Sequence, residues 1–429
     1  MGSFWADPYT FVVVWLMGVL RGWGLPDDAA QLILFILGAA ILAVLSLFWV
    51  VFVIWVERKI GGRVQDRLGP NRLGPFGLFQ PVADMLKIFT KEFITPVGVD
   101  KVPYQLAPIL AVAGVMMLWA VIPFSINWFG SDLNVGVLYL VAVGGIAEMG
   151  IILAGWGSNN KFALLGAFRA VAQLVSYEVP MVISLLVPVM LSGSMKLNEI
   201  VRSQEIWYIV VAPIPALIFF ISSIAENSRA PFDLLEADSE LVSGFNVEYS
   251  GLKFGFYFVG DFLHAFTIAL LFTTLFLGGW RGPGAEQYPI LGFVWFFLKT
   301  WIVYILNLVI RFTLPRFRID QMMNLNWKLL TPLALASVLV TAIVDKLGPA
   351  GNGLIRVGAL ILANLALLVR LKTYLTNYSY AGKFFRHPYL RMAYTFQNIY
   401  VGQSPYDSPA LFSMIPAAEL TEGSFFPAG

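Results

Sequence analysis

Residues 30–56 read AQLILFILGAAILAVLSLFWVVFVIWV, a run without a single Asp, Glu, Lys or Arg. A helix rises about 1.5 Å per residue, so roughly 20 apolar residues cross the hydrocarbon core of a bilayer. The run is longer than that minimum and carries no charge to be moved out of water. It therefore predicts a transmembrane helix.

Similar runs recur along the rest of the chain, and each predicts another crossing. They cover residues 104–125, 133–157, 163–191, 205–225, 252–280, 288–312, 329–345 and 353–371. The stretch from Tyr9 to Leu20 is apolar but too short to span, so we expect an interfacial segment there. The predicted fold class is an all-α polytopic membrane protein with about nine transmembrane helices plus an amphipathic helix on the cytoplasmic side.

Composition excludes several classes of protein. Of 429 residues, 58% are hydrophobic and 13% are charged; soluble domains are near 45–50% apolar and about 25% charged. The chain has no Cys, which excludes disulfides and iron–sulfur clusters held by its own thiolates. Its two His, His264 and His387, lie far apart, so a metal site made by this chain alone is not expected. No phosphate-binding glycine loop and no nucleophile–base pair is evident.

Charge distribution predicts the orientation. With nine spans, the loops that follow the first span and its odd-numbered successors, together with the C-terminal tail, carry most of the Lys and Arg. The opposite side carries five: Arg21, Lys196, Arg202, Arg281 and Lys346. The positive-inside rule then places the C-terminus in the cytoplasm and the N-terminus outside. We expect three regions: an N-terminal interfacial segment (1–29), a transmembrane domain (30–371) and a cytoplasmic-side tail (372–429).

The loop region 57–103 contains the first chemical signal. Two Gly-Pro steps, at residues 69–70 and 74–75, enforce turns. An amphipathic stretch follows, with apolar positions at Phe79, Val82, Leu86, Phe89 and Phe93 and polar positions at Gln80, Asp84, Lys87 and Lys91. One interpretation is a helix lying on lipid headgroups; the other is a helix whose polar face lines a chamber roofed by protein. Asp84 among the cations favours the chamber.

Acidic residues form the second signal. Residues 226–253 contain six acids: Glu226, Asp233, Glu236, Asp238, Glu240 and Glu248. Three further carboxylates, Glu148, Glu178 and Asp261, lie inside predicted spans, where an ionised side chain costs about 2.5–3.5 kcal/mol on insertion scales. A solvated loop and scattered structural pairs remain the simpler interpretations, and for His264 a structural pair is favoured. The whole set favours a proton relay.

A third segment, residues 315–328, follows the span at 288–312. Arg316, Arg318 and Asp320 suggest an ion-pair cluster on the cytoplasmic side. Structural anchoring is its default role, and contact with a neighbouring subunit is the functional alternative.

Taken in order, these segments resemble the H-type membrane subunit of bacterial NADH:quinone oxidoreductase (respiratory complex I), the counterpart of mitochondrial subunit 1. The resemblance covers about residues 30–345 and rests on several ordered blocks of sequence. These are ERK (57–59) with the double Gly-Pro block, QPVADMLK (80–87), NKFALLG (160–166), RAVAQ (169–173), SYE (176–178), RAPFD (229–233), ELVSGFNVEY (240–249), PRFR (315–318) and DQ (320–321). Any one block is weak, but the ordered set is specific.

The resemblance implies two groups of site residues. The residues that would frame a quinone chamber are Glu57, Arg58, Arg67, Asp84, Lys87, Arg229 and Asp233. The residues that would start a proton path are Glu148, Glu178, Glu226, Glu236, Asp238, Glu240, Glu248 and Asp261. Asp238 and Asp261 stand where the family often has Glu, so each acid reaches one methylene less far. No residue is implied as a metal ligand, and no active site is complete in this chain.

The resemblance also implies the surroundings of the protein. Quinone would be the substrate, while flavin and iron–sulfur clusters would sit in partner subunits. The partners would be the peripheral-arm subunits of the quinone site, the antiporter-like membrane subunits and membrane lipid, with no role for nucleic acid. The location would be the bacterial inner (plasma) membrane.

Two alternatives remain open at the level of sequence. The first is the same type of subunit in a related membrane-bound hydrogenase or another dehydrogenase. The second is a stand-alone ion-coupled transporter, whose typical signature is an inverted repeat with broken helices. We find no such internal symmetry in the sequence.

Overall fold

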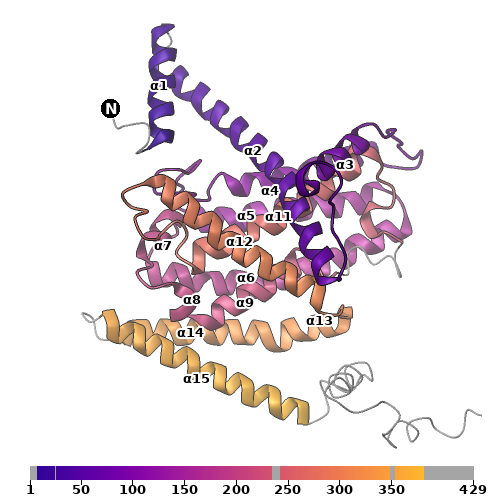
Figure 1. The fold of residues 1–429 in the computed structure, drawn as a ribbon. Coiled ribbons are helices and arrows are strands. Elements are labelled where there is room, and N and C mark those ends of the chain that lie inside the picture. The colour runs from indigo at the N-terminus through magenta and orange to yellow at the C-terminus, as the bar shows by residue number, and fades with distance from the viewer. Residues whose placement is uncertain (1–6, 25, 234–241, 348–352, 381–429) are drawn as a thin grey trace, which may run out of the picture. The chain divides into compact units, whose positions relative to one another are not determined.

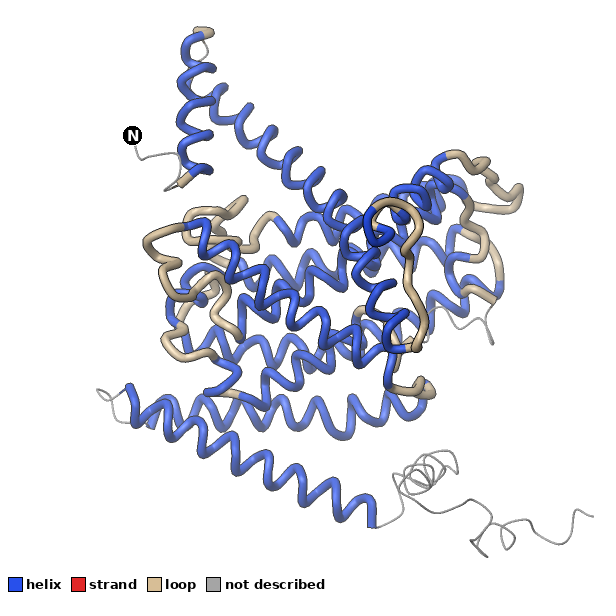
Figure 2. The backbone as a smooth tube through the Cα atoms, in the orientation of Figure 1, coloured by secondary structure: helices blue, strands red, loops and turns tan. Residues whose placement is uncertain are grey.

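The computed structural model describes residues 7–24, 26–233, 242–347 and 353–380. Within these residues the chain consists of helices and loops, without a strand (Figure 2). Two separately compact units divide the chain, residues 1–365 and 366–429. The site and the contacts discussed below belong to the first unit. Three predicted relay residues, Glu236, Asp238 and Glu240, lie outside the described residues.

Seven helical segments of the described chain are long and apolar enough to cross a membrane. They are α2 (Asp27–Val64), α4 (Lys101–Trp119), α5 (Gly136–Gly157), α6 (Lys161–Ser192), α11 (Gly251–Phe276), α12 (Pro289–Thr313) and the segment Ile319–Lys346, which includes most of α14 (Thr331–Leu347). The other two predicted spans correspond to shorter apolar helices, α9 (Pro213–Glu226) and residues Val357–Arg370 of α15 (Gly353–Tyr380). The predicted polytopic all-α fold is confirmed.

Shorter elements connect these helices. They are α1 (Pro8–Gly22), η1 (Pro75–Gly77), α3 (Gln80–Phe89), α7 (Leu197–Ser203), α8 (Tyr208–Val211), η2 (Gly244–Asn246), α13 (Ile319–Leu325) and the π-helical turn η3 (Asn326–Leu330). The predicted amphipathic helix is confirmed as α3. Pro81 occupies its first turn, where a missing backbone N–H costs nothing. Both Gly-Pro steps lie in the connection between α2 and α3, as predicted.

Helix α11 forms the centre of the first unit. It packs against α2, α4 and α12 (Figure 1). Most of its side chains from Phe262 to Phe276 are buried. A helix enclosed on all sides is apolar all round rather than along one stripe. A polar group on the buried part of α11 therefore needs a partner, as His264 does near the middle of the helix.

Small residues bring α4 and α5 together. A Cβ atom on Gly114 would lie 2.7 Å from the backbone nitrogen of Ala147, and one on Gly150 would lie 2.7 Å from that of Ala111. Membrane helices pack closely where such residues let the backbones approach. Glu148 lies on α5 within this closely packed pair of helices.

Helix α2 differs between its two halves. Its N-terminal half forms a hairpin with α1 (Figure 1). This half exposes large apolar side chains such as Leu32, Phe35 and Ile36. Its C-terminal half enters the bundle, where Val53 and Glu57 are buried. The helix thereby brings Glu57 and Arg58 to the place where α3 and α11 meet.

Candidate functional site

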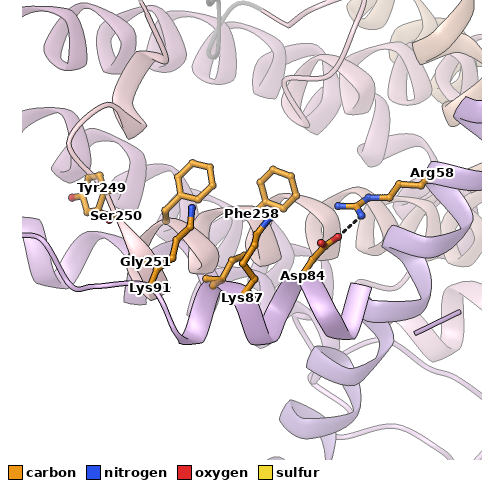
Figure 3. A pocket seen from close by; sticks show the side chains of 10 residues that line it. Arg58, Asp84, Lys87, Lys91, Tyr249, Ser250, Gly251 and Phe258 are labelled. Atoms are coloured by element: carbon orange, nitrogen blue, oxygen red, sulfur yellow. Dashed lines mark hydrogen bonds and ion pairs between the residues drawn. The ribbon is translucent and has the colours of Figure 1, made fainter. Parts of the chain in front are cut away.

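A pocket with a volume of about 520 Å³ opens between α3 and the start of α11. Its polar wall consists of Arg58 from α2, Asp84 and Lys87 from α3, and Lys91 just beyond α3. Its other wall consists of Ile88, Tyr249, Ser250, Gly251, Phe254 and Phe258. In Figure 3, Arg58 and Asp84 point toward one another, and Lys87 and Lys91 extend toward the side on which Phe258 lies. The polar residues of α3 therefore line this open pocket.

The apolar face of α3 points the other way. Phe79, Leu86 and Phe89 are each at least half exposed. A helix lying flat on lipid would turn its charged face outward to the headgroups. Here Asp84 and Lys87 line the pocket, while Phe79, Leu86 and Phe89 do not and remain exposed.

Arg58 and Asp84 form an ion pair on the rim of this pocket. Both side chains remain partly exposed, and Gln80 donates a long hydrogen bond of 3.5 Å to the same carboxylate. Pairs in contact with water contribute little net free energy because water competes for both partners. The two side chains can therefore exchange partners when a ligand enters.

One lining residue of the pocket, Tyr249, belongs to a cluster of three tyrosines. The rings of Tyr104 and Tyr249 stack with centroids 4.3 Å apart, and Tyr257 meets Tyr249 edge-on at 5.0 Å. The Tyr249 hydroxyl donates to the backbone carbonyl of Tyr104 at 3.2 Å. Burial raises the pKa of Tyr249 to about 12, so this hydroxyl stays protonated at physiological pH. The pocket therefore combines a neutral tyrosine, Tyr249, with the cations Arg58, Lys87 and Lys91.

A buried ionic cluster surrounds Glu57, the residue before Arg58 on α2. Glu57 has 5% of its surface exposed and accepts from three donors, Arg229, Arg311 and Tyr304. The Arg229 Nη1–Glu57 Oε2 distance is 2.7 Å and the Tyr304 Oη–Glu57 Oε2 distance is 3.0 Å. A buried carboxylate is tolerated only when paired and hydrogen-bonded, and three donors satisfy that condition.

Arg229 links this carboxylate to a second one. Its Nη2 lies 3.0 Å from Asp261 Oδ2, and its guanidinium carbon lies 4.8 Å from the centroid of the Phe262 ring. With Arg311 included, the cluster contains two cations and two anions. Asp261 is the exposed end, with 47% of its side chain accessible. The cluster is neutral as a whole, so gaining or losing one charge disturbs every member.

Further acids continue inward from Asp261. His264, one turn later on α11, lies 3.8 Å from Glu226 at the end of α9. Glu226 in turn lies close enough to Glu148 and Glu178 for the three negative charges to repel one another. Glu226 Oε2 is buried and has no hydrogen-bond partner in the described part of the chain. The three acids form one electrostatically coupled group on α5, α6 and α9.

The remaining candidates stand apart from these clusters or at their edge. The Glu248 carboxylate accepts a hydrogen bond of 2.7 Å from Asn160, and its backbone carbonyl accepts one of 2.9 Å from the Tyr104 hydroxyl. Arg67 is exposed beyond the end of α2 and contacts Gln65. Asp233 is partly buried, directly before residues that are not described. The structure thus brings together nine of the fifteen candidates: three at the pocket, three in the buried ionic cluster and three in the group of coupled acids. Arg67 lies outside all three groups.

The predicted ion-pair cluster in the third segment is wrong. Arg316, Arg318 and Asp320 are all exposed, and no ion pair joins these three described residues. Charges that remain in water gain little by pairing. The segment is held instead by Phe317, whose N–H donates to the carbonyl of Pro231 at 2.9 Å.

Sequence reasoning misses three members of the site. Arg311 lies at the end of an apolar run and Tyr304 lies inside it, and neither carries a local signal. For His264 the sequence favours a structural pair, yet its nearest carboxylate is that of Glu226, a predicted relay residue. The spacing of three between Asp261 and His264 is the available signal, because it places both on one face of α11.

Comparison with known proteins shows the family of the chain. A family model described as NADH dehydrogenase matches residues 37–342. The chain is 45% identical to the H-type NADH-quinone oxidoreductase subunit of Dehalococcoides mccartyi strain CBDB1, over 75% of this chain and 89% of that protein.

Two further relatives show the same pattern. Identity is 49% to the first of the H-type NADH-quinone oxidoreductase subunits of Geobacter metallireducens, over 68% of this chain and 90% of that protein. It is 46% to the H-type subunit of Geobacillus sp. strain WCH70, over 75% of this chain and 97% of that protein. The chain belongs to the NADH dehydrogenase family of membrane proteins, together with the H-type subunits of NADH-quinone oxidoreductase.

Proposed function

We propose that this chain forms the membrane side of a quinone chamber and couples quinone reduction to proton translocation. As a member of its family it is a multi-pass membrane subunit of complex I and assembles with other subunits of that enzyme. The observation that carries the finer proposal is the position of Arg229. This residue joins Glu57, the neighbour of a pocket residue, to Asp261, the first acid of the inward path.

The pocket between α3 and α11 suits a quinone headgroup. Arg58, Lys87 and Lys91 offer hydrogen-bond donors and positive charge to the quinone oxygens, which become more basic on reduction. Phe254 and Phe258 on the facing wall offer apolar surface to the ring and to the start of an isoprenoid tail. A site with one cationic and one aromatic wall stabilises the reduced anionic ligand more than the neutral one.

A change of charge at the pocket affects the buried cluster because Glu57 and Arg58 are neighbours on α2. Glu57 and Arg58 are consecutive, so one faces the cluster and the other faces the pocket. A negative charge that draws Arg58 away from Asp84 changes the field at Glu57 and hence the balance between Glu57, Arg229 and Asp261. Protons then redistribute among His264, Glu226, Glu178 and Glu148, which titrate as a coupled group.

The missing parts of the reaction belong to partners. This chain has no Cys with which to hold an iron–sulfur cluster. As the family resemblance implies, we propose that the clusters and the flavin are bound by the peripheral-arm subunits. The antiporter-like membrane subunits would receive the signal from the inner acids. We place the enzyme in the bacterial inner membrane with the cationic loops and the C-terminus in the cytoplasm.

Glu226→Gln tests the proposal. The substitution keeps size and hydrogen-bonding capacity but fixes one relay position as uncharged, so proton-coupled quinone reduction by the assembled complex should fall about 10- to 100-fold. The matched control is Glu286→Gln, since Glu286 is an exposed acid, 3.9 Å from Arg281, on the loop before α12. Turnover and proton uptake are measured in proteoliposomes. Wild-type values for an assembled Glu226→Gln complex contradict the relay.

A further inference from the structure

Pro180 opens a gap in the hydrogen bonds of α6. A proline within a helix has no N–H to donate to the carbonyl four residues earlier. For Pro180 that carbonyl belongs to Ser176, a buried residue. A buried carbonyl without a donor is unfavourable, so another group must supply the missing hydrogen bond.

Asn326 supplies it from a different helix. Its Nδ2 donates to the Ser176 carbonyl oxygen, across 150 residues of sequence. Asn326 has no exposed surface and begins the π-helical turn η3 between α13 and α14. A π-turn shifts the register of the side chains that follow it, and such turns are frequent at functional sites.

We infer that Asn326 is a positioning residue: it replaces the hydrogen bond that Pro180 removes and thereby fixes the turn of α6 that carries Glu178. The inference rests on the proposed function, in which Glu178 belongs to the proton relay. Asn326 touches neither quinone nor a transferred proton. It acts through the backbone of Ser176, two residues before the acid.

Neighbouring contacts show that this turn of α6 is held from two sides. Gln173 Nε2 donates to the carbonyls of Ala225 at 2.6 Å and Phe232 at 2.8 Å, on either side of Glu226 and Arg229. The Tyr177 hydroxyl donates to the carbonyl of Met322 in α13 at 3.0 Å. Asn326 and Tyr177 therefore tie α6 to the α13–η3 segment, while Gln173 ties it to the end of α9. The separation of Glu178 from Glu226 depends on both sets of bonds.

A double-mutant cycle tests the assignment. Pro180→Ala returns a backbone N–H to the Ser176 carbonyl, so the amide of Asn326 becomes dispensable. Asn326→Leu, of similar volume but without donors, should lower proton-coupled quinone reduction about fivefold to tenfold in the wild-type background, as expected for one buried donor lost. In the Pro180→Ala background the same substitution should change turnover less than about twofold.

Two matched controls accompany the cycle. Pro188 is the second proline inside α6, and its missing N–H concerns the Ser184 carbonyl instead. Pro188→Ala should therefore leave the Asn326→Leu defect in place. Asn324 is exposed two residues before Asn326, so Asn324→Leu makes the same chemical change without touching α6.

Two readouts separate this inference from the relay itself. The thermal unfolding midpoint of the assembled complex reports the hydrogen bond, and the pH profile of coupled turnover reports the position of Glu178. Asn326→Leu should lower the first and shift the second, and Pro180→Ala should suppress both effects. A variant that fails to assemble alone but assembles with Pro180→Ala gives the same support.

An equal Asn326→Leu defect in the wild-type and Pro180→Ala backgrounds overturns the inference, as does an unchanged pH profile. Glu178→Gln measures the relay separately in the same complex. Wild-type turnover of Glu178→Gln removes Glu178 from the relay, while the cycle in unfolding midpoint still decides whether Asn326 replaces the bond lost at Pro180.

Discussion

Glu57 and Arg58 are neighbours on α2 but occupy opposite environments. The Glu57 side chain is 7% accessible and has three donors, whereas that of Arg58 is 39% accessible and pairs with Asp84. Consecutive residues on a helix point about 100° apart, so one turn of α2 serves both the buried cluster and the pocket. The difference separates two tasks: the buried cluster fixes geometry, and the rim pair remains free to respond to a ligand.

Arg229→Met should give the largest effect. It leaves Glu57 with one cation fewer in a buried site, and breaking a buried ion pair by removing one partner costs about 3–5 kcal/mol. The measurement is the thermal unfolding midpoint and yield of the assembled complex. Arg58→Met is the control on the rim, where the loss should be about 0–1 kcal/mol. Equal losses at the two positions contradict the division between a fixing and a responding group.

Tyr304→Phe should give an intermediate effect. It removes only the hydroxyl that donates to Glu57 at 3.0 Å and keeps the buried ring. Loss of one hydrogen bond to a buried charged group should destabilise the complex by about 1–3 kcal/mol. Tyr139→Phe provides the control, since its hydroxyl donates to the Met117 carbonyl away from the cluster. A larger loss of stability for Tyr139→Phe than for Tyr304→Phe contradicts the predicted importance of the hydrogen bond to Glu57.

Asp84→Asn should give the smallest effect on stability and still change function. The rim pair contributes no more than about 1 kcal/mol to folding. Freed from its partner, Arg58 is available to the ligand at all times, so the KM for quinone should change by up to about fivefold, and less at high ionic strength. Steady-state kinetics at two salt concentrations measure this change. A large drop in the unfolding midpoint would place Asp84 with the fixing group.

Local patterns in the sequence carry part of this picture. The spacing of three and four in residues 79–93 predicts α3 and its polar face, because both follow from helix geometry alone. Acids within apolar runs of sequence single out Glu148, Glu178 and Asp261, because inserting a charge into a membrane span is unfavourable. Such signals are local and need no knowledge of the fold.

Partnerships across the fold are not predictable from the same patterns. Glu57 bonds to Tyr304 and Arg311, which lie 247 and 254 residues away. Asn326 meets a carbonyl freed by Pro180, which no spacing rule connects to it. Exposed cations in the third segment suggest a cluster that does not form. Tertiary packing decides which polar groups meet, and the apolar runs that direct packing resemble one another too closely to specify pairs.

The length of α2 has a consequence for the membrane. Its 38 residues extend for about 57 Å, against a hydrocarbon core of about 30 Å. A helix that exceeds the core by this much must tilt or project beyond it. Its C-terminal half packs in the bundle, whereas its N-terminal half is largely exposed. The start of α1 is tied to the loop after α4, because Asp7 accepts hydrogen bonds of 3.1 Å from Asn127 and Trp128. We therefore expect the exposed start of α2 to tilt when the bilayer thickness changes, while Glu57 and Arg58 keep their places.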